Sequence, residues 1–177
     1  VVKDHIETLR ERQHRLRAEM SEADERLTEA HGRQSELELD RLELQDQAMR
    51  EEWYRSSRYY RELRELNSQD IDLRTEIGDQ AYDQYLYQTG EENRVGIASV
   101  IQGSEAEQSG LLPGDIVERY GDVRVLEYSD LRGATARGAR GETVPVLIRR
   151  GDSLIEVMMA RGPMGVRLKM DIAPPGD

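Results

Sequence analysis

The residues best suited to chemistry lie near the end of the chain, where Gly162–Leu168 reads GPMGVRL. Glycines in a short loop can turn successive backbone N–H groups toward one point, which creates a small site for an anion. The loop leads into Val166–Met170, whose alternating apolar and charged residues predict a strand with one buried face. This order favours the capture of a peptide end over catalysis.

Side chains that commonly catalyse reactions are absent or scattered. The chain has no cysteine, which excludes a thiol nucleophile, a thiolate metal site and a disulfide. His5, His14 and His31 all lie in an N-terminal helical segment, at spacings that match no metal site on one helix face. A Ser-His-Asp triad around Ser104 or Ser153 is therefore not expected. We predict a protein that is not an enzyme and has no metal or cofactor.

The composition limits the kinds of partner. The formal net charge is −11, and no basic stripe offers the electrostatic footprint of nucleic-acid binding or an attraction to anionic membranes. No apolar run approaches 18 residues, so we expect no membrane insertion within this segment. Because the chain opens Val-Val-Lys without Met, we expect either an upstream signal peptide or membrane anchor, or a trimmed sequence.

Residues 1–66 are predicted to form a coiled-coil helix. With Ile6 as position a and Leu9 as position d, ten of thirteen core positions up to Ala48 are apolar. The alternative is a long solvated helix packed on another helix of the same chain. In the coiled-coil interpretation the chain forms a homo-oligomer through an apolar seam whose main residues are Ile6, Leu9, Leu16, Met20, Leu27, Leu37 and Leu44.

The remaining chain separates into a connecting segment and a β-rich domain. Residues 67–93 are predicted to hold an amphipathic helix, Asp70–Tyr87, that stops at Gly90, followed by a linker. Residues 94–177 are predicted to form a small, partly open β-barrel with two short helices, so the fold class is α+β. The expected elements are strands Val95–Ile101, Asp115–Tyr120, Val123–Leu126, Thr143–Arg149, Ser153–Ala160 and Val166–Met170, and helices capped by Ser104 and by Ser129 or Asp130.

The β-rich segment resembles a bacterial, circularly permuted PDZ domain over residues 94–172. The resemblance rests on the pattern I-x-x-V-x-x-G-S-x-A-x-x-x-G-L-x-x-G-D-x-V, met by Ile97, Val100, Gly103-Ser104, Ala106, Gly110-Leu111, Gly114-Asp115 and Val117. Such domains accompany periplasmic trypsin-like proteases, C-terminal processing proteases and secretion-system proteins. In many members the carboxylate-binding loop precedes the first strand, but here GEENR cannot supply it. We infer that the permutation places the loop and groove strand at the end of the chain.

The resemblance implies a binding site for peptide C-termini. The N–H groups of Met164, Gly165 and Val166 would bind a terminal carboxylate, and Arg161 would add charge. The peptide would extend along Val166–Met170 as an added strand. Its side chains would lie in a groove formed by residues on the strand and on the second short helix, namely Leu168, Met170, Leu131 and Thr135. The alternative is that Gly162–Gly165 is only a tight turn, with Met164 and Val166 in the core.

Together these features predict a non-catalytic adaptor that captures C-terminal or extended peptide segments by β-augmentation and oligomerises through its coiled coil. One alternative is a regulatory PDZ-containing fragment of a larger periplasmic protease or secretion-system protein. Another is a purely structural role in which the groove stays empty. The resemblance implies a bacterial periplasmic location, with a possible anchor upstream of Val1.

Overall fold

A computed structural model describes residues 2–70 and 72–175. The chain divides after Tyr82 into two compact units. Among the described residues, no helix combines the length and the apolar character that a membrane crossing requires.

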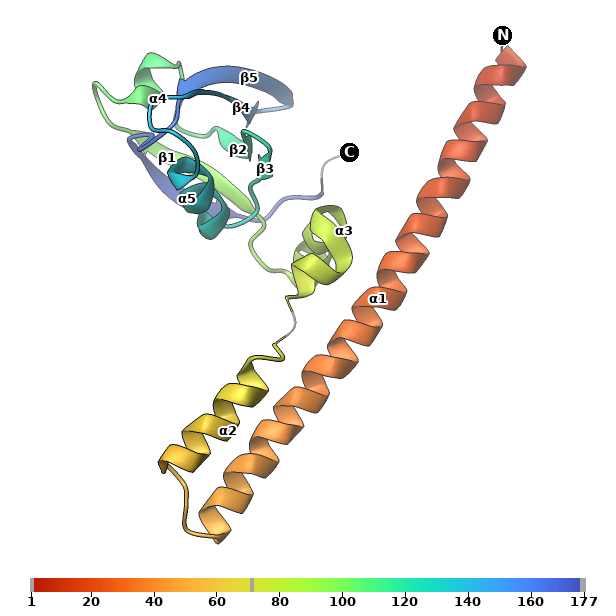
Figure 1. The fold of residues 1–177 in the computed structure, drawn as a ribbon. Helices are drawn as coiled ribbons and strands as arrows, with labels where there is room; N and C mark the ends of the chain where they lie inside the picture. Colours follow the sequence, from red (N-terminus) through yellow and green to blue (C-terminus); the bar gives the residue numbers. More distant parts are fainter. Residues whose placement is uncertain (1, 71, 176–177) are drawn as a thin grey trace. The chain divides into compact units, whose positions relative to one another are not determined.

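The first unit is a helical hairpin. Helix α1 (Val2–Arg50) has no proline and runs for 49 residues. Helix α2 (Ser57–Asn67) returns alongside the C-terminal part of α1 (Figure 1). The intervening turn caps α1, since the N–H groups of Trp53 and Tyr54 both donate to the Ala48 carbonyl at 2.9 Å.

An aromatic cluster holds the hairpin together. Tyr59 of α2 is buried against Leu44 and Ala48 of α1. The Tyr54 ring meets the Tyr59 ring edge-on, with 4.9 Å between centroids. Arg58 lies over the Trp53 ring at 4.1 Å from its centroid. The aromatic residues after position 50 therefore pack a turn between two helices of one chain.

The hairpin divides the apolar seam of α1 into two parts. Leu37 and Leu44 are buried within the chain. Toward the N-terminus, by contrast, the side chains of Ile6, Leu9, Leu16 and Met20 are between 43% and 63% exposed. The C-terminal part of the seam therefore follows the alternative considered from sequence, a helix packed on another helix of the same chain. Only the N-terminal part remains open to a second chain.

Helix α3 (Leu73–Thr89) spans the boundary between the units and is interrupted at Gly78. Gly78 has φ 82° and ψ 164°, a left-handed conformation that residues with a Cβ rarely adopt. The helix ends as the sequence predicts, because Gly90 adopts φ 74° and the Glu91 N–H reaches back to the Leu86 carbonyl at 2.8 Å.

The second unit is an antiparallel sheet with two short helices. The strands are β1 (Arg94–Val100), β2 (Ile116–Tyr120), β3 (Val123–Arg124), β4 (Thr143–Arg150), β5 (Ser153–Ala160) and β6 (Val166–Asp171), and the helices are α4 (Glu105–Gln108) and α5 (Tyr128–Ala136). The order β5-β4-β2-β1-β6 leaves β6 at one edge, and β3 pairs with β2. The predicted α+β class is confirmed.

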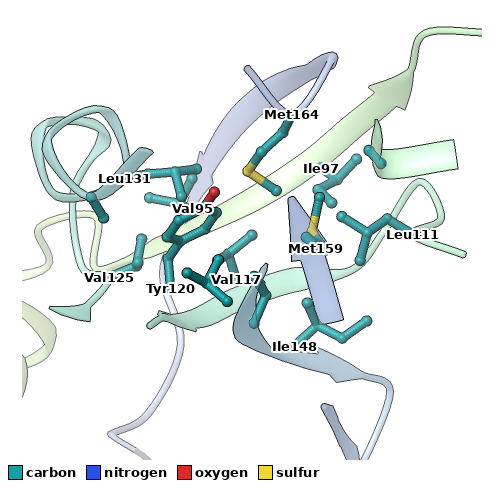
Figure 2. Packing of buried hydrophobic residues seen from close by; sticks show 14 residues of the cluster. Val95, Ile97, Leu111, Val117, Tyr120, Val125, Leu131, Ile148, Met159 and Met164 are labelled. Carbon is teal, nitrogen blue, oxygen red and sulfur yellow. The ribbon is translucent and has the colours of Figure 1, made fainter. Parts of the chain in front are cut away.

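The core of this unit is one cluster of buried apolar side chains from the strands, the two short helices and the loop before β6 (Figure 2). Val95 and Ile97 of β1 are fully buried, as are Val117 and Tyr120 of β2. Strand β1 is buried along its first four residues because it lies between β2 and β6. Met164, Leu131 and Met159 complete the cluster from the loop, α5 and β5.

Two short helices begin differently from one another. At α4, the Glu107 N–H bonds to the Ser104 Oγ at 3.2 Å, which confirms Ser104 as the predicted cap. The Glu107 carboxylate accepts from the Gly103 N–H at 2.7 Å instead of from the cap residue itself. At α5 the prediction of Ser129 or Asp130 as cap is wrong, because Glu127 occupies that position. Asp130 instead accepts from the Glu127 N–H at 2.9 Å.

Candidate binding site at the edge strand

The loop before β6 is fixed by its carbonyl groups. The Met164 carbonyl accepts the Ala106 N–H of α4, and the Gly165 carbonyl accepts the Ile101 N–H after β1, both at 2.9 Å. The peptide groups before and after the α-carbon of Gly165 are thus both hydrogen-bonded to the rest of the domain.

These anchors determine where the loop's N–H groups point. In a trans peptide the N–H lies opposite the C=O, and the described chain has no cis peptide. The N–H of Gly165 therefore points away from α4, and the N–H of Val166 points away from β1. Both donors are thus directed away from these two partners, where an anion could accept from them.

Gly165 is required by both its conformation and its surroundings. Its φ is 77°, and a Cβ built on it would lie 2.2 Å from the Ser104 Cβ. Real Cβ atoms do not approach so closely, so any side chain at position 165 would push the loop away from the start of α4. The loop geometry thus depends on a contact between residues 61 positions apart in sequence.

Strand β6 offers a free edge that continues from the loop. It pairs with β1 from Arg94↔Asp171 to Val100↔Val166, and no strand within residues 2–70 and 72–175 pairs with its other side. Val166, Leu168 and Met170 lie half-buried against the core, whereas Arg167 and Lys169 are exposed. The alternation matches the sequence prediction of a strand with one buried face.

The residues predicted for the groove occupy different depths. Leu131 of α5 and Met164 of the loop are almost fully buried and reach into the same cluster (Figure 2). Thr135 is half-buried, and its hydroxyl donates to the Arg132 carbonyl at 3.0 Å. The Met164 side chain thus belongs to the core, as the alternative interpretation of the loop held, so its possible contact with a ligand is through the backbone.

Arg161 connects the end of β5 to α5. Its Nη1 donates to the Ala134 carbonyl at 2.7 Å, and its Nε donates to the Glu142 carboxylate at 3.0 Å. The guanidinium also lies 5.8 Å from the centroid of the Tyr120 ring. Burial is the main cause that raises the pKa of the Tyr120 hydroxyl, and the Gly162 backbone and the Arg161 charge oppose it.

A shallow cleft lies at the other end of β6. It is lined by Met170, by Tyr128 and Ser129 at the start of α5, and by carboxylates that include Glu91 and Glu127. No group of three His, Cys, Asp or Glu side chains that could hold a metal ion occurs in the described part of the chain.

Two buried carboxylates were not singled out from the sequence. Asp115 accepts two bonds from Arg150 and one from the Leu112 N–H, all at 2.8 Å. Burial alone would raise the pKa of Asp115, but these hydrogen bonds outweigh it and the pKa is lowered. In the sequence, the Gly114-Asp115 pair of the motif could have indicated that Asp115 is buried. An aspartate in this position is equally expected from turn formation alone.

The second buried carboxylate, Asp83 of α3, organises a polar cluster. It accepts from Arg94 Nη1 at 2.6 Å, from Asn93 Nδ2 at 2.7 Å and from Arg124 Nη2 at 2.5 Å. Asn93 and Arg94 also bind the segment after β6, through the carbonyls of Ala173 and Pro174. The C-terminal half of α3 is thereby attached to the second unit.

Comparisons with known proteins identify this fold. The family model of the PDZ domain matches residues 96–150, which run from β1 to β4. Residues 96–150 are therefore part of a PDZ domain, and the predicted resemblance to that family is confirmed. The matched region ends before the loop and β6. A search of curated proteins found no match.

Solved structures include similar segments of larger proteins. An aminopeptidase N family protein from Idiomarina loihiensis is 19% identical, with a TM-score of 0.33, over 45% of this chain and 15% of that one. An HtrA-type protease with a decapeptide is 17% identical, with a TM-score of 0.35, over 54% of this chain and 34% of that one. The alignments span about a third of those chains or less.

Proposed function

We propose that the PDZ domain captures the free C-terminus, or an extended segment, of another protein. The peptide adds as a strand to the outer edge of β6, and its terminal carboxylate binds the N–H groups of Met164, Gly165 and Val166. The chain acts in this role as a non-catalytic adaptor.

One observation carries this proposal. The carbonyls of Met164 and Gly165 are bound by Ala106 of α4 and by Ile101, which leaves the N–H groups of Gly165 and Val166 directed away from these partners at the head of an edge strand. A carboxylate accepting from backbone N–H groups forms short, charge-assisted hydrogen bonds. Arg161 stands directly before the loop and adds positive charge near it, although two of its nitrogens also bind Ala134 and Glu142.

Side chains beside the edge would select the ligand. Leu168 and Met170 lie half-buried along β6. The proposed opposite wall is α5, with half-buried Thr135 at its surface and the almost fully buried Leu131 supporting it from the core. Apolar residues at alternate ligand positions would pack on these side chains, because a bound strand directs every second side chain to the same face.

The exposed part of the α1 seam supports a second element of the proposal, homo-oligomerisation through a coiled coil. Ile6, Leu9, Leu16 and Met20 repeat at heptad spacing, with Leu27 half-buried next in the series, and they remain open to solvent. Joining several PDZ domains in one oligomer would raise the avidity for weakly bound peptides. We also propose a bacterial periplasmic location, which a reporter fused to the complete gene product would test.

Peptide binding can be tested with the full chain and a displayed library of random peptides with free C-termini. The strongest binder would be labelled with fluorescein at its N-terminus and measured by fluorescence anisotropy. The matched ligand has the same sequence with an amidated C-terminus. We expect amidation to weaken binding at least about tenfold, because it removes the charge that the N–H groups bind.

Two results would count against the proposal. If the amidated peptide bound as tightly as the free acid, the loop would not be a carboxylate site. If no peptide from a large library bound, the purely structural role would be favoured instead.

A further inference from the structure

The N-terminal half of α1 carries an exposed apolar seam flanked by a distinctive pattern of charges. In the heptad register set by Ile6 and Leu9, the flanking e positions are Lys3, Arg10, Arg17 and Asp24, and the g positions include Arg12, Glu19 and Arg26. These flanking residues face the partner helix in a coiled coil and set its orientation.

A parallel, in-register pair of these helices brings like charges together. In that arrangement each g residue meets the e residue five positions later in the other copy. Arg12 then faces Arg17 of the second copy, and Glu19 faces Asp24. Each contact occurs twice in a symmetric dimer, so four like-charge pairs flank the seam.

An antiparallel pair replaces most of these like-charge contacts with contacts between opposite charges. In one register, Ile6 lies opposite Ala23 of the second copy and Leu9 lies opposite Met20. In this arrangement g residues of one helix face g residues of the other, and e residues face e residues. Arg12 then meets Glu19 and Lys3 meets Asp24, each twice, and the remaining flanking pair of like charge is Arg10 with Arg17. Sliding the helices by one heptad places Arg12 against either Arg12 or Arg26, so the charges also select the register.

We propose that residues 2–27 of α1 bind the same segment of a second copy of this chain, as an antiparallel two-stranded coiled coil. The proposal rests on the oligomerisation proposed above and adds its partner, orientation and register. In a parallel pair Gln13 would lie opposite Gln13 of the second copy, and this pairing would be tolerated. The core residues therefore do not decide the orientation of the helices. The flanking charges decide it.

Disulfide trapping tests the orientation directly, because the chain has no cysteine of its own. Leu9→Cys and Met20→Cys would be prepared in the full chain and oxidised mildly, separately and as a mixture. In the antiparallel register the two positions share a layer, whereas two copies of residue 20 lie about 16 Å apart along the axis. A disulfide requires Cα atoms within about 7 Å.

We expect little covalent dimer from either variant alone and a mixed disulfide from the mixture. A parallel coiled coil would instead give self-linked dimers of both variants. Sedimentation of the unmodified chain separates failure of this proposal from failure of oligomerisation itself. A monomer at tens of micromolar contradicts both, and a dimer with self-linked cysteines contradicts the orientation alone.

A charge reversal gives an independent test, because it should weaken an antiparallel dimer and strengthen a parallel one. Arg12→Glu creates repulsion with Glu19 in the antiparallel pair but an attraction to Arg17 in the parallel pair. We expect the dimer to weaken about tenfold, and the additional change Glu19→Arg to restore it. Arg15→Glu makes the same change of charge at an outer c position and should have little effect. A tighter dimer for Arg12→Glu would overturn the proposal.

Discussion

Gly165 is constrained both by its backbone conformation and by its surroundings. It adopts a left-handed conformation, and its α-carbon lies against the Ser104 side chain that caps α4. Gly151, in the turn between β4 and β5, has a similar positive φ but open space around it. Substitutions at the two glycines therefore distinguish the effect of backbone strain, present at both, from the effect of moving the loop, present only at Gly165.

We predict that Gly165→Ala abolishes measurable binding of the selected peptide, because the new methyl group must displace the N–H groups from their directions. Gly151→Ala should cost about 1 kcal/mol in stability from the left-handed conformation alone and leave binding unchanged. Anisotropy with the labelled peptide and thermal unfolding would be measured on both variants. Equal binding by Gly165→Ala would show that the loop is not the site.

Asp115 should make the stability of the PDZ domain depend on pH. Its pKa is lowered in the folded state, so its contribution is complete above the ordinary value of 3.8 and is lost as the pH falls through the lowered pKa. We predict that Asp115→Asn lowers the free energy of unfolding by about 3 kcal/mol at pH 7 and that this deficit shrinks below about pH 4. Urea unfolding at several pH values would test this.

The matched control for this measurement is Asp152→Asn, at an exposed turn position. It should change the free energy of unfolding by less than about 0.5 kcal/mol at pH 7. A deficit for Asp115→Asn that stayed constant down to pH 2 would mean that the carboxylate's charge is not what stabilises the fold.

At the scale of elements, the hairpin of α1 and α2 depends on a small aromatic core. We predict that Tyr59→Ala destabilises the hairpin by about 3 kcal/mol, because it removes a buried ring that contacts Leu44, Ala48 and Tyr54. Tyr60→Ala, at a neighbouring position where the ring is half exposed, should cost much less. Hydrogen exchange within residues 57–67 would compare the two. Similar exchange rates in both variants would contradict the assigned core.

The strands of the second unit could be predicted because their signals are local. Alternating residues mark β6, and glycines with positive φ stand at the turns, as at Gly114 and Gly151. The division of the α1 seam could not be predicted, since an apolar heptad repeat suits a helix of the same chain as well as one from a second copy. Leu44 is buried by α2 and Leu16 remains exposed, although both occupy d positions.

The candidate site was only partly predictable. The glycine loop and strand were visible in the sequence, but the anchoring of the Met164 carbonyl by Ala106 is a tertiary contact with no local signature. The cluster around Asp83 was missed for a related reason. In a chain with 36 acidic residues, local sequence does not indicate which carboxylate is buried.

At the scale of the whole molecule, the Asp83 cluster binds the C-terminal half of α3 to the rest of the second unit. Asp83 and Arg94 are both almost completely buried, and removing one member of a buried pair leaves the other charge uncompensated. We predict that Asp83→Ala lowers the stability of the second unit by about 3 to 5 kcal/mol and removes the exchange protection of the Ala173 N–H, which donates to Asn93.

Asp79→Ala is the matched control, because Asp79 lies in the same helix but pairs with Arg74 at the surface. Its loss should cost less than about 1 kcal/mol. Equal effects of the two substitutions would show that the buried cluster contributes no more than an exposed ion pair.

The position of this cluster has a mechanical consequence. If a peptide adds to the edge of β6 as proposed, a pull on it acts on this strand, and the segment after β6 is bonded to Asn93 and Arg94 through Ala173 and Pro174. Because the same two residues bind Asp83, such a force would reach the C-terminal half of α3 through side chains as well as along the backbone.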